Sequence, residues 1–254
     1  MPHIRRVASI SAVLGLLILS GTRVPLSLNR ASQQPRLVLW AWERAEDLRF
    51  LPSKRIRVAF LAGSVYLDAQ PVLRPRQQLL RVAEETPVTA VVRLEITPNT
   101  PTVFTEGYRS KVMQQILRLV ALPRVSALQL DFDATRSQRD FYRALLRDIR
   151  HGMPTAMPLS ITALGSWCLG DDWLGALPID DAVPMMFRIG PDGADIVRWI
   201  HSGQDFREPL CRHSVGISTD EPWPAALLDR TVYVFNPQAW DRTTLAAVER
   251  GLQP

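Results

Sequence analysis

Two aspartates close an alternating segment, Leu128-Gln-Leu-Asp-Phe-Asp-Ala-Thr135. Successive side chains of a β-strand point to opposite faces, so the two leucines and the phenylalanine would share one face, and Gln129, Asp131 and Asp133 the other. Carboxylates that end an apolar strand are costly to bury without partners. In barrel enzymes, catalytic groups collect at the ends of strands. We therefore expect a functional site here, with carboxylates that could act as acid or base.

Short apolar strands recur along the chain with helical or loop segments between them. We interpret residues 37–43, 57–67, 88–96, 126–134, 159–164, 182–189, 215–220 and 232–235 as strands. Helical periodicity is clearest over residues 108–121 and 137–150. Strands rich in Val, Ile and Leu, separated by covering helices, indicate parallel pairing. The sequence therefore predicts an α/β protein, a single (β/α)8 TIM-type barrel with parallel strands over residues 36–254. A doubly wound open sheet is the alternative, but no glycine-rich phosphate loop follows any strand.

Alternation also predicts which side chains point into the barrel. The expected inward set is Arg93, Glu95, Gln129, Asp131, Asp133, Ser160, Thr162, Met186, Arg188, Ser218 and Asp220, with Glu221 just beyond. Such a polar interior is either a ligand-binding or catalytic cleft, or a buried ion network in which arginines neutralise carboxylates.

The chain resembles an uncharacterised bacterial family, catalogued as domain of unknown function 3142, in six segments. They are Trp40-Ala-Trp-Glu-Arg44, Leu128-Gln-Leu-Asp-Phe-Asp-Ala-Thr135, Leu159-Ser-Ile-Thr-Ala-Leu-Gly-Ser-Trp-Cys168, Ala182-Val-Pro-Met-Met-Phe-Arg188, Gly216-Ile-Ser-Thr-Asp-Glu221 and Tyr233-Val-Phe-Asn-Pro237. The resemblance covers nearly all of the chain after its N-terminal segment. It implies no reaction, because the family has no established activity.

A more distant resemblance is to chitinase-like glycosidases, which carry Asp-x-Asp-x-Glu at the end of barrel strand four. Asp131 and Asp133 match the two aspartates, whereas Thr135 stands where the glutamic acid would be. The segment Met185-Met-Phe-Arg188 loosely matches a strand-six motif, with Arg188 in place of an aspartate, and Trp240 could match a tryptophan that follows strand eight. Threonine cannot supply a general acid, so the resemblance implies a glycosidase-like barrel without implying its mechanism.

Glycoside hydrolysis needs two carboxyl groups that flank the scissile bond. The expected catalytic candidates are Asp131, Asp133, Glu95, Asp220 and Glu221, with Asp133 paired to Glu95, Asp220 or Glu221. The expected substrate-binding residues are Trp40, Trp42, Glu43, Arg93, Gln129, Thr162, Trp167, Arg188 and Asn236. Tryptophans near the rim could stack on sugar rings, although a tryptophan at a strand end more often packs in the core. We rank carbohydrate hydrolysis slightly above carbohydrate binding without catalysis.

The N-terminus has the layout of an export signal. Basic residues at positions 3–6 precede an uncharged run over residues 7–20. We expect residues 1–23 to be a signal peptide or a membrane anchor, 24–35 a linker, and the barrel to be periplasmic or secreted. Tethering to the inner membrane by an uncleaved segment is the alternative, although the run is short for a membrane span.

The net charge of +5 and pI of about 9.7 do not indicate a nucleic-acid partner. The basic residues are scattered, and no basic cluster interleaved with aromatics or zinc-ligand spacing appears. No cofactor is expected. Oxygen ligands from Asp131, Asp133, Asp220 and Glu221 could hold a hard cation, but no compact loop motif supports a metal site.

Cys168 and Cys211 are the only cysteines. In an oxidising compartment they could form one disulfide. Against this, the strand assignment places them at opposite ends of the barrel, and a bridge needs Cα atoms within about 7 Å. Both alternatives stay open.

Two pairs of aspartates lie in predicted loops, Asp171-Asp172 and Asp180-Asp181. The first would cap or begin a helix and the second would lead into strand six, so we expect solvated roles for both pairs.

Overall fold

The structure is a computed structural model that describes Met1 and residues 37–52, 55–97, 102–190 and 193–253. The predicted signal or anchor segment and the linker lie outside the described residues, apart from Met1. The chain divides into Met1–Gln33 and a compact unit, Gln34–Pro254, and the fold described below is that of the second unit. Within the described residues, no helix has both the length and the apolar character needed to cross a bilayer.

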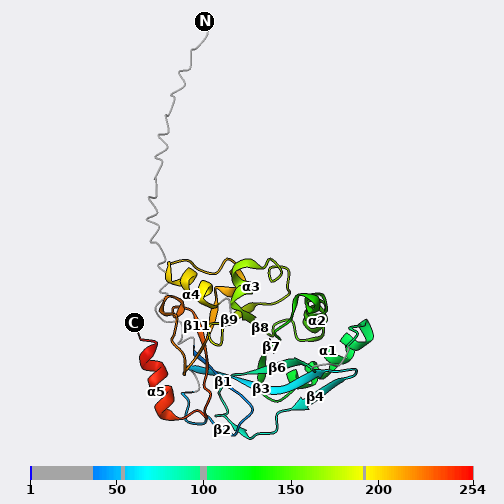
Figure 1. Ribbon diagram of the computed structural model, residues 1–254, viewed down its shortest axis with the longest axis horizontal. Helices are drawn as coiled ribbons and strands as arrows, with labels where there is room; N and C mark the ends of the chain where they lie inside the picture. The colour runs from blue at the N-terminus through cyan, green and yellow to red at the C-terminus, as the bar shows by residue number, and fades with distance from the viewer. Residues whose placement is uncertain (2–36, 53–54, 98–101, 191–192, 254) are drawn as a thin grey trace. The chain divides into compact units, whose positions relative to one another are not determined.

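Eight parallel strands form a closed barrel (Figure 1). In order around the barrel they are β1 (Leu37–Ala41), β3 (Ile56–Leu67), β6 (Val88–Ile96), β7 (Val125–Asp131), β8 (Leu159–Leu164), β9 (Asp181–Met185), β10 (Ser214–Ser218) and β11 (Thr231–Phe235). The first strand closes the ring because β1 pairs with both β3 and β11. The predicted barrel is thereby confirmed, with each strand close to its predicted position.

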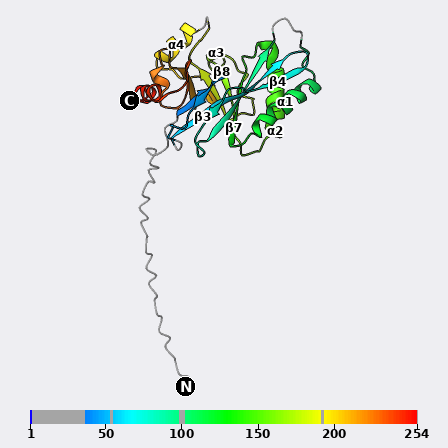
Figure 2. The same cartoon turned by 90° about the horizontal axis from the view of Figure 1, so that it is seen from below.

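The connections differ along the chain. Helices follow five of the described barrel strands: α1 (Glu106–Val120), α2 (Arg139–Gly152), α3 (Gly165–Gly170), α4 (Gly193–His201) and α5 (Arg242–Gly251) come after β6, β7, β8, β9 and β11. Short 3-10 turns occur at Arg136–Gln138, Pro209–Cys211 and Ala225–Leu227. The first two connections instead carry β2 (Glu46–Asp47), β4 (Pro71–Pro75) and β5 (Leu80–Arg81). Of these, β4 pairs antiparallel with β3, and α1 contacts it (Figure 2).

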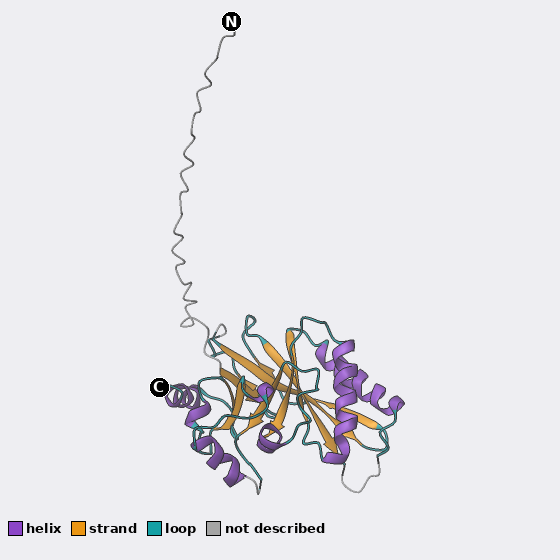
Figure 3. Ribbon diagram, turned by 90° about the horizontal axis from the view of Figure 1, so that it is seen from above, coloured by secondary structure: helices purple, strands orange, loops and turns teal. Residues whose placement is uncertain are grey.

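The helices cover the outer face of the barrel. In Figure 3 the helices lie around the strands. Helices α1 and α2 contact each other on one flank, and α3 contacts α4 on another (Figure 2). The large core lies between these helices and the outer face of the strands, whereas a smaller cluster fills the barrel interior. Leu128, Leu130 and Phe132 belong to the outer core, as their alternation with polar residues predicts. Sequence patterning therefore gives the orientation of β7 correctly.

The orientation predicted for strand six is wrong. Val183 belongs to the interior cluster, and Met185 and Phe187 line a pocket, whereas Met186 packs in the outer core. The strand is apolar on both faces, as parallel barrel strands usually are. Alternation of residue types therefore does not reveal which of its side chains point into the barrel. The strand also ends at Met185, four residues earlier than predicted.

Cys168 and Cys211 form a disulfide, with their Cα atoms 5.8 Å apart. The two cysteines are not separated by the barrel, because α3 leaves the carboxyl end of β8 and lies outside the barrel, beside the segment that precedes Cys211. The backbone N–H groups of Arg207 and Glu208 donate to the Cys168 carbonyl at 2.9 and 3.1 Å. The bridge therefore joins two stretches that already lie side by side.

Breaking this disulfide should destabilise the fold. The bridged cysteines are 43 residues apart, which corresponds to about 4 kcal/mol of loop-closure entropy at most. Urea unfolding with and without reductant measures the difference. The double variant Cys168→Ala/Cys211→Ala is the control, and its midpoint should not respond to reductant. An equal midpoint for the oxidised and reduced wild-type protein would contradict this expectation.

Candidate functional site

A pocket of about 490 Å³ lies at the carboxyl ends of the barrel strands. Its aromatic and aliphatic lining is Trp40, Trp42, Leu164, Met185, Phe187, Ile189, Ile196 and Phe235, and its charged, polar or small lining is Arg93, Asp131, Asp133, Thr162, Gly165, Ser166, Arg188 and Gly190. This volume is in the range of small-molecule sites, and the carboxyl end is where barrel enzymes place theirs.

The indole of Trp40 is held firmly in the barrel interior. Its Nε1 donates a 2.8 Å hydrogen bond to Gln129 Oε1, and Gln129 Nε2 donates to Ser160 Oγ at 3.3 Å. The other side of the ring needs Gly216, because a Cβ there would lie 2.8 Å from Cη2 of Trp40. Tyr233 packs beside the indole at 5.2 Å between ring centroids. The ring is therefore fixed by a polar contact and by close packing together.

Asp131 is the buried carboxylate of the pocket. Thr162 Oγ1 donates to its Oδ1 at 2.7 Å, and the Arg93 guanidinium lies 3.8 Å from its Oδ2. Burial raises the pKa of Asp131, although the Thr162 hydrogen bond and the Arg93 charge oppose this shift. Glu95 lies 3.5 Å from Arg93 on the same strand. The pocket wall thus carries a carboxyl group that holds its proton more tightly than an exposed aspartate does.

The side chains beyond Asp131 diverge. Asp133 is exposed and lines the pocket, and its carboxylate accepts no hydrogen bond from any residue that the structure describes. Thr135 begins the turn Arg136–Gln138 in a capping box with Gln138 and does not line the pocket. Thr135 therefore has a structural role at the start of this turn.

Three aromatic rings form one wall of the pocket. Phe187 and Phe235 are parallel within 2°, with centroids 5.8 Å apart, and Trp42 meets Phe235 edge-on at 6.2 Å. All three side chains are half-buried, so part of each ring remains exposed. Such a surface can pack against the apolar face of a flat ligand.

Arg188 enters the pocket from a strained backbone. Its φ of +50° lies in the left-handed region, which is uncommon for residues other than glycine. Both carboxylate oxygens of Glu221 accept its backbone N–H, at 3.1 and 3.0 Å. The guanidinium lies over the Phe235 ring at 5.1 Å and 3.8 Å from Asp220 Oδ2. Asp220 also accepts from the Ser218 hydroxyl, which lowers its pKa.

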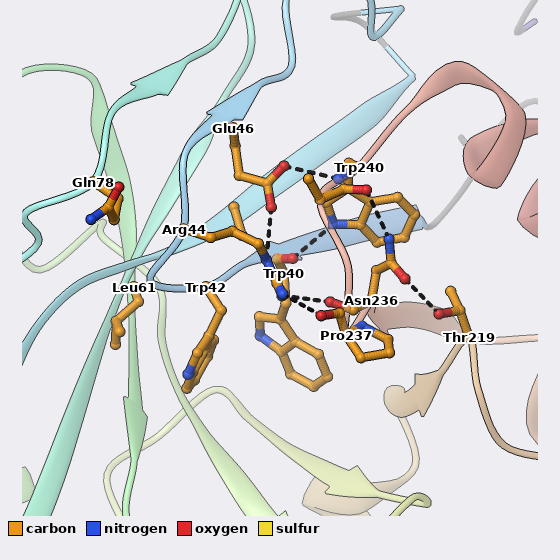
Figure 4. A network of polar contacts seen from close by, with 12 residues as sticks. Trp40, Trp42, Arg44, Glu46, Leu61, Gln78, Thr219, Asn236, Pro237 and Trp240 are labelled. Carbon is orange, nitrogen blue, oxygen red and sulfur yellow. Dashed lines mark hydrogen bonds and ion pairs between the residues drawn. The ribbon is translucent and has the colours of Figure 1, made fainter.

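A polar network secures the segment that follows β1 (Figure 4). The Arg44 guanidinium donates to the carbonyls of Asn236 and Pro237 and to Glu46 Oε1. Glu46 Oε2 accepts from the Trp240 backbone N–H at 2.9 Å. Burial raises the pKa of Glu46, although the contacts with Arg44 and the Trp240 N–H act to lower it. The network holds the β1 segment against the one that follows β11, and so fixes the wall that carries Trp42.

The structure brings together half of the predicted site residues around the pocket. Seven line it: Trp40, Trp42, Arg93, Asp131, Asp133, Thr162 and Arg188. Glu95, Asp220 and Glu221 contact the two lining arginines instead.

Four predicted ligand-binding residues lie away from the pocket. Gln129 is fully buried and supports Trp40, and Asn236 joins Thr219 Oγ1 and the Ala239 carbonyl. Glu43 accepts from the backbone N–H groups of Gln77 and Gln78. Trp167 is buried edge-on against Trp173 in the outer core, where it cannot reach a ligand in the pocket. Its place in α3 turns it outward, which strand alternation could not reveal.

Of the three rings in the aromatic wall, the sequence predicted Trp42 but not Phe187 or Phe235. Both phenylalanines lie in segments that carry the family resemblance, but the predicted orientation of strand six placed Phe187 on the outer face. The available signal was Arg188, a charged residue directly after two methionines and a phenylalanine, which marks the place where the strand has ended.

The barrel interior holds a second acidic residue. The sequence suggests a solvated role for Asp181, but the structure partly buries it, with a 2.6 Å hydrogen bond from Ser214 Oγ. Burial raises its pKa to about 6, against that bond and the charges of His213 and Arg57. Asp180 behaves more as expected, since it pairs with Arg150 and accepts the Leu159 N–H. Asp171 pairs with Arg139.

Within the residues that the structure describes, no group of three or more His, Cys, Asp or Glu side chains is arranged to hold a metal ion.

The chain is a closed parallel (β/α)8 barrel with a pocket at its carboxyl end, a fold that it shares with solved chitinase structures. It is similar to a chitinase from Rhizomucor miehei, with a TM-score of 0.54 and 11% identity over 86% of this chain and 100% of that one. It is also similar to a protein assigned as chitinase A from Streptomyces coelicolor, with a TM-score of 0.53 and 9% identity over 85% and 97%. At such identities the likeness shows the shared fold alone.

No protein-family model matches the chain, so the expected membership of the uncharacterised bacterial family finds no support there. No curated protein matches it in sequence either.

Gly216→Ala should lower the free energy of unfolding by about 1–3 kcal/mol, because the new methyl group would push the fixed Trp40 ring. Urea unfolding followed by tryptophan fluorescence measures this. Gly170→Ala is the matched control, since a Cβ there meets nothing within 4 Å. Equal stability of the two variants would show that the Trp40 ring is free to move.

The raised pKa of Asp181 predicts a pH dependence of stability. Its folded pKa of about 6 exceeds its ordinary value of 3.8, so the folded state binds the proton more tightly. Stability from this group is present below pH 4 and falls as pH rises through 6, by up to about 3 kcal/mol. We expect Asp181→Asn to remove this loss, measured by urea unfolding between pH 4 and 7. Asp140→Asn is the control, because Asp140 is an exposed residue of α2, and this variant should follow the wild type.

Proposed function

We propose that this barrel binds a saccharide in the pocket. The observation that carries the proposal is the wall of half-buried aromatic rings, Trp42, Phe187 and Phe235, beside polar groups in a concave site at the carboxyl end of the barrel. The apolar face of a sugar ring can pack on aromatic faces, while Asp133, Thr162 and the arginines offer hydrogen bonds to hydroxyl groups. The fold shared with chitinases supports a carbohydrate ligand by analogy only.

Binding without hydrolysis is the reading that the geometry favours. A glycosidase needs a general acid at the scissile bond. Thr135 occupies the position of the acid found in chitinase-like enzymes, and its hydroxyl and backbone serve the start of a 3-10 turn.

Hydrolysis is the second candidate because of one specific observation. Asp131 and Asp133 both line the pocket, and burial raises the pKa of Asp131 while Asp133 is exposed. Two carboxyl groups in unlike environments can divide the roles of acid and base. In that case Asp131 would donate the proton and Asp133 would serve as base or nucleophile.

The purified full chain, tested on a panel of polysaccharides for binding and for release of reducing ends, separates the two candidates. We expect binding without release. Trp42→Ala should weaken binding about tenfold or more, because it removes a stacking surface. Trp199→Ala is the matched control, since Trp199 is also half-buried but lies on α4 and does not line the pocket.

Each other outcome has a definite meaning. Release that Asp133→Asn abolishes, with binding retained, would establish hydrolysis in place of simple binding. Failure of the wild-type protein to bind any saccharide, or binding that Trp42→Ala leaves unchanged, would remove the pocket as a carbohydrate site.

A further inference from the structure

Arg188 is held in an unfavourable backbone conformation. A non-glycine residue at φ +50° costs free energy and persists only where its surroundings impose it. Here Glu221 uses both carboxylate oxygens to accept the Arg188 backbone N–H. Such strained residues cluster at ligand-binding sites, and Arg188 lines the pocket.

The Arg188 side chain is oriented but its hydrogen-bonding groups are not used. The guanidinium stacks over Phe235 at 5.1 Å. Its nearest carboxylate is Asp220 at 3.8 Å, which is beyond hydrogen-bond distance. This guanidinium donates no hydrogen bond to any residue that the structure describes. A guanidinium that stacks by its face keeps its N–H edge free for a planar partner.

A second guanidinium in the pocket also has hydrogen-bond donors without an acceptor among the described residues. Arg93 lies 3.5 Å from Glu95 and 3.8 Å from Asp131, and it donates no hydrogen bond to any residue in the described part of the chain. Arg93 comes from β6 and Arg188 follows β9, so β7 and β8 separate them around the barrel. The pocket thus offers two cationic forks in different parts of its lining.

The carboxylates near these arginines are largely engaged by other donors. Asp131 accepts from Thr162, Asp220 from Ser218, and Glu221 from the Arg188 backbone. Asp133 and Glu95 lie on the β6 and β7 side, away from Arg188 in the strand order. Beside the ring wall, the N–H groups of Arg188 are therefore available for hydrogen bonds to an added carboxylate.

We propose that the saccharide bound in this pocket carries a carboxylate, as a uronic acid does, and that Arg188 grips this group through its free N–H edge. The inference rests on the proposed saccharide binding and specifies its ligand class. A carboxylate matches the planar guanidinium with two parallel hydrogen bonds, whereas a neutral hydroxyl group does not.

The test compares an oligogalacturonide with its methyl ester, a pair that differs in the charge of the carboxyl groups. Calorimetry on the purified full chain should give at least about tenfold tighter binding of the acid, because hydrogen bonds between charged groups are stronger than those to a neutral ester. The preference should weaken as salt rises. Arg188→Met should remove most of the preference, because it should weaken binding of the acid much more than binding of the ester.

Further variants isolate the role of the charge. Arg188→Lys should keep part of the preference, since it keeps the charge and loses the fork. Asp220→Asn should tighten binding of the acid, because it removes the nearest competing carboxylate. Arg198→Met is the matched control, as Arg198 is an exposed arginine on α4 that pairs with Asp195 outside the pocket. It should bind like the wild type, and thermal unfolding confirms that each variant is folded.

The outcomes distinguish this inference from the function on which it rests. Equal affinity for the acid and the ester, or a preference that survives in Arg188→Met, overturns the carboxylate assignment and leaves saccharide binding intact. Tighter binding of a sulfated saccharide than of the uronate also overturns it. Binding of neither ligand, nor of any neutral saccharide, overturns the proposed function itself.

Discussion

The hydrogen bond from the Trp40 indole to Gln129 is the contact around which this site is organised. Gln129 is fully buried, so a lost partner would leave an amide without its hydrogen bond in the barrel interior. The backbone of the same tryptophan contacts the outer layer, because its carbonyl accepts a hydrogen bond from the Trp240 Nε1–H at 2.9 Å. One residue therefore couples the barrel interior to the segment that follows β11. Any shift of this ring would alter the pocket and the outer packing together.

The charged groups of the pocket are arranged in two shells. Inside, Asp131 is buried and bonded to Thr162. At the rim, Glu221 holds the Arg188 backbone while Asp220 stays beside its side chain. In such an arrangement the acids orient the arginines without occupying their hydrogen-bonding groups. Binding specificity would then depend on which ligand group accepts hydrogen bonds from the arginines. Polar groups of a concave site that have no protein partner are the ones that discriminate between ligands.

Much of the fold could be predicted from the sequence, and the reasons differ between strands. On β7 the two faces differ in polarity, so alternation gave both the strand and its orientation. On β9 both faces are apolar, so alternation did not show which side chains point inward, and Phe187 was not predicted to line the pocket. Trp167 could not be placed because it lies just beyond a strand end, in a helix whose direction depends on tertiary packing. The cysteine pairing depended on where α3 runs, which the strand order does not contain. Local periodicity therefore predicts elements, whereas contacts between distant loops come only from the assembled barrel.

The appended strand β4 has a consequence for solubility. It pairs with β3 on one side, and within the described residues its other side pairs with no strand. A free strand edge is a template for association between copies of a chain. Here the edge begins and ends with proline, at Pro71 and Pro75, and proline has no N–H to donate to a neighbouring strand. The Gln115 side chain from α1 also occupies the Pro71 carbonyl at 2.8 Å. The barrel can thus carry an extra strand at its border without offering that border to intermolecular sheet growth.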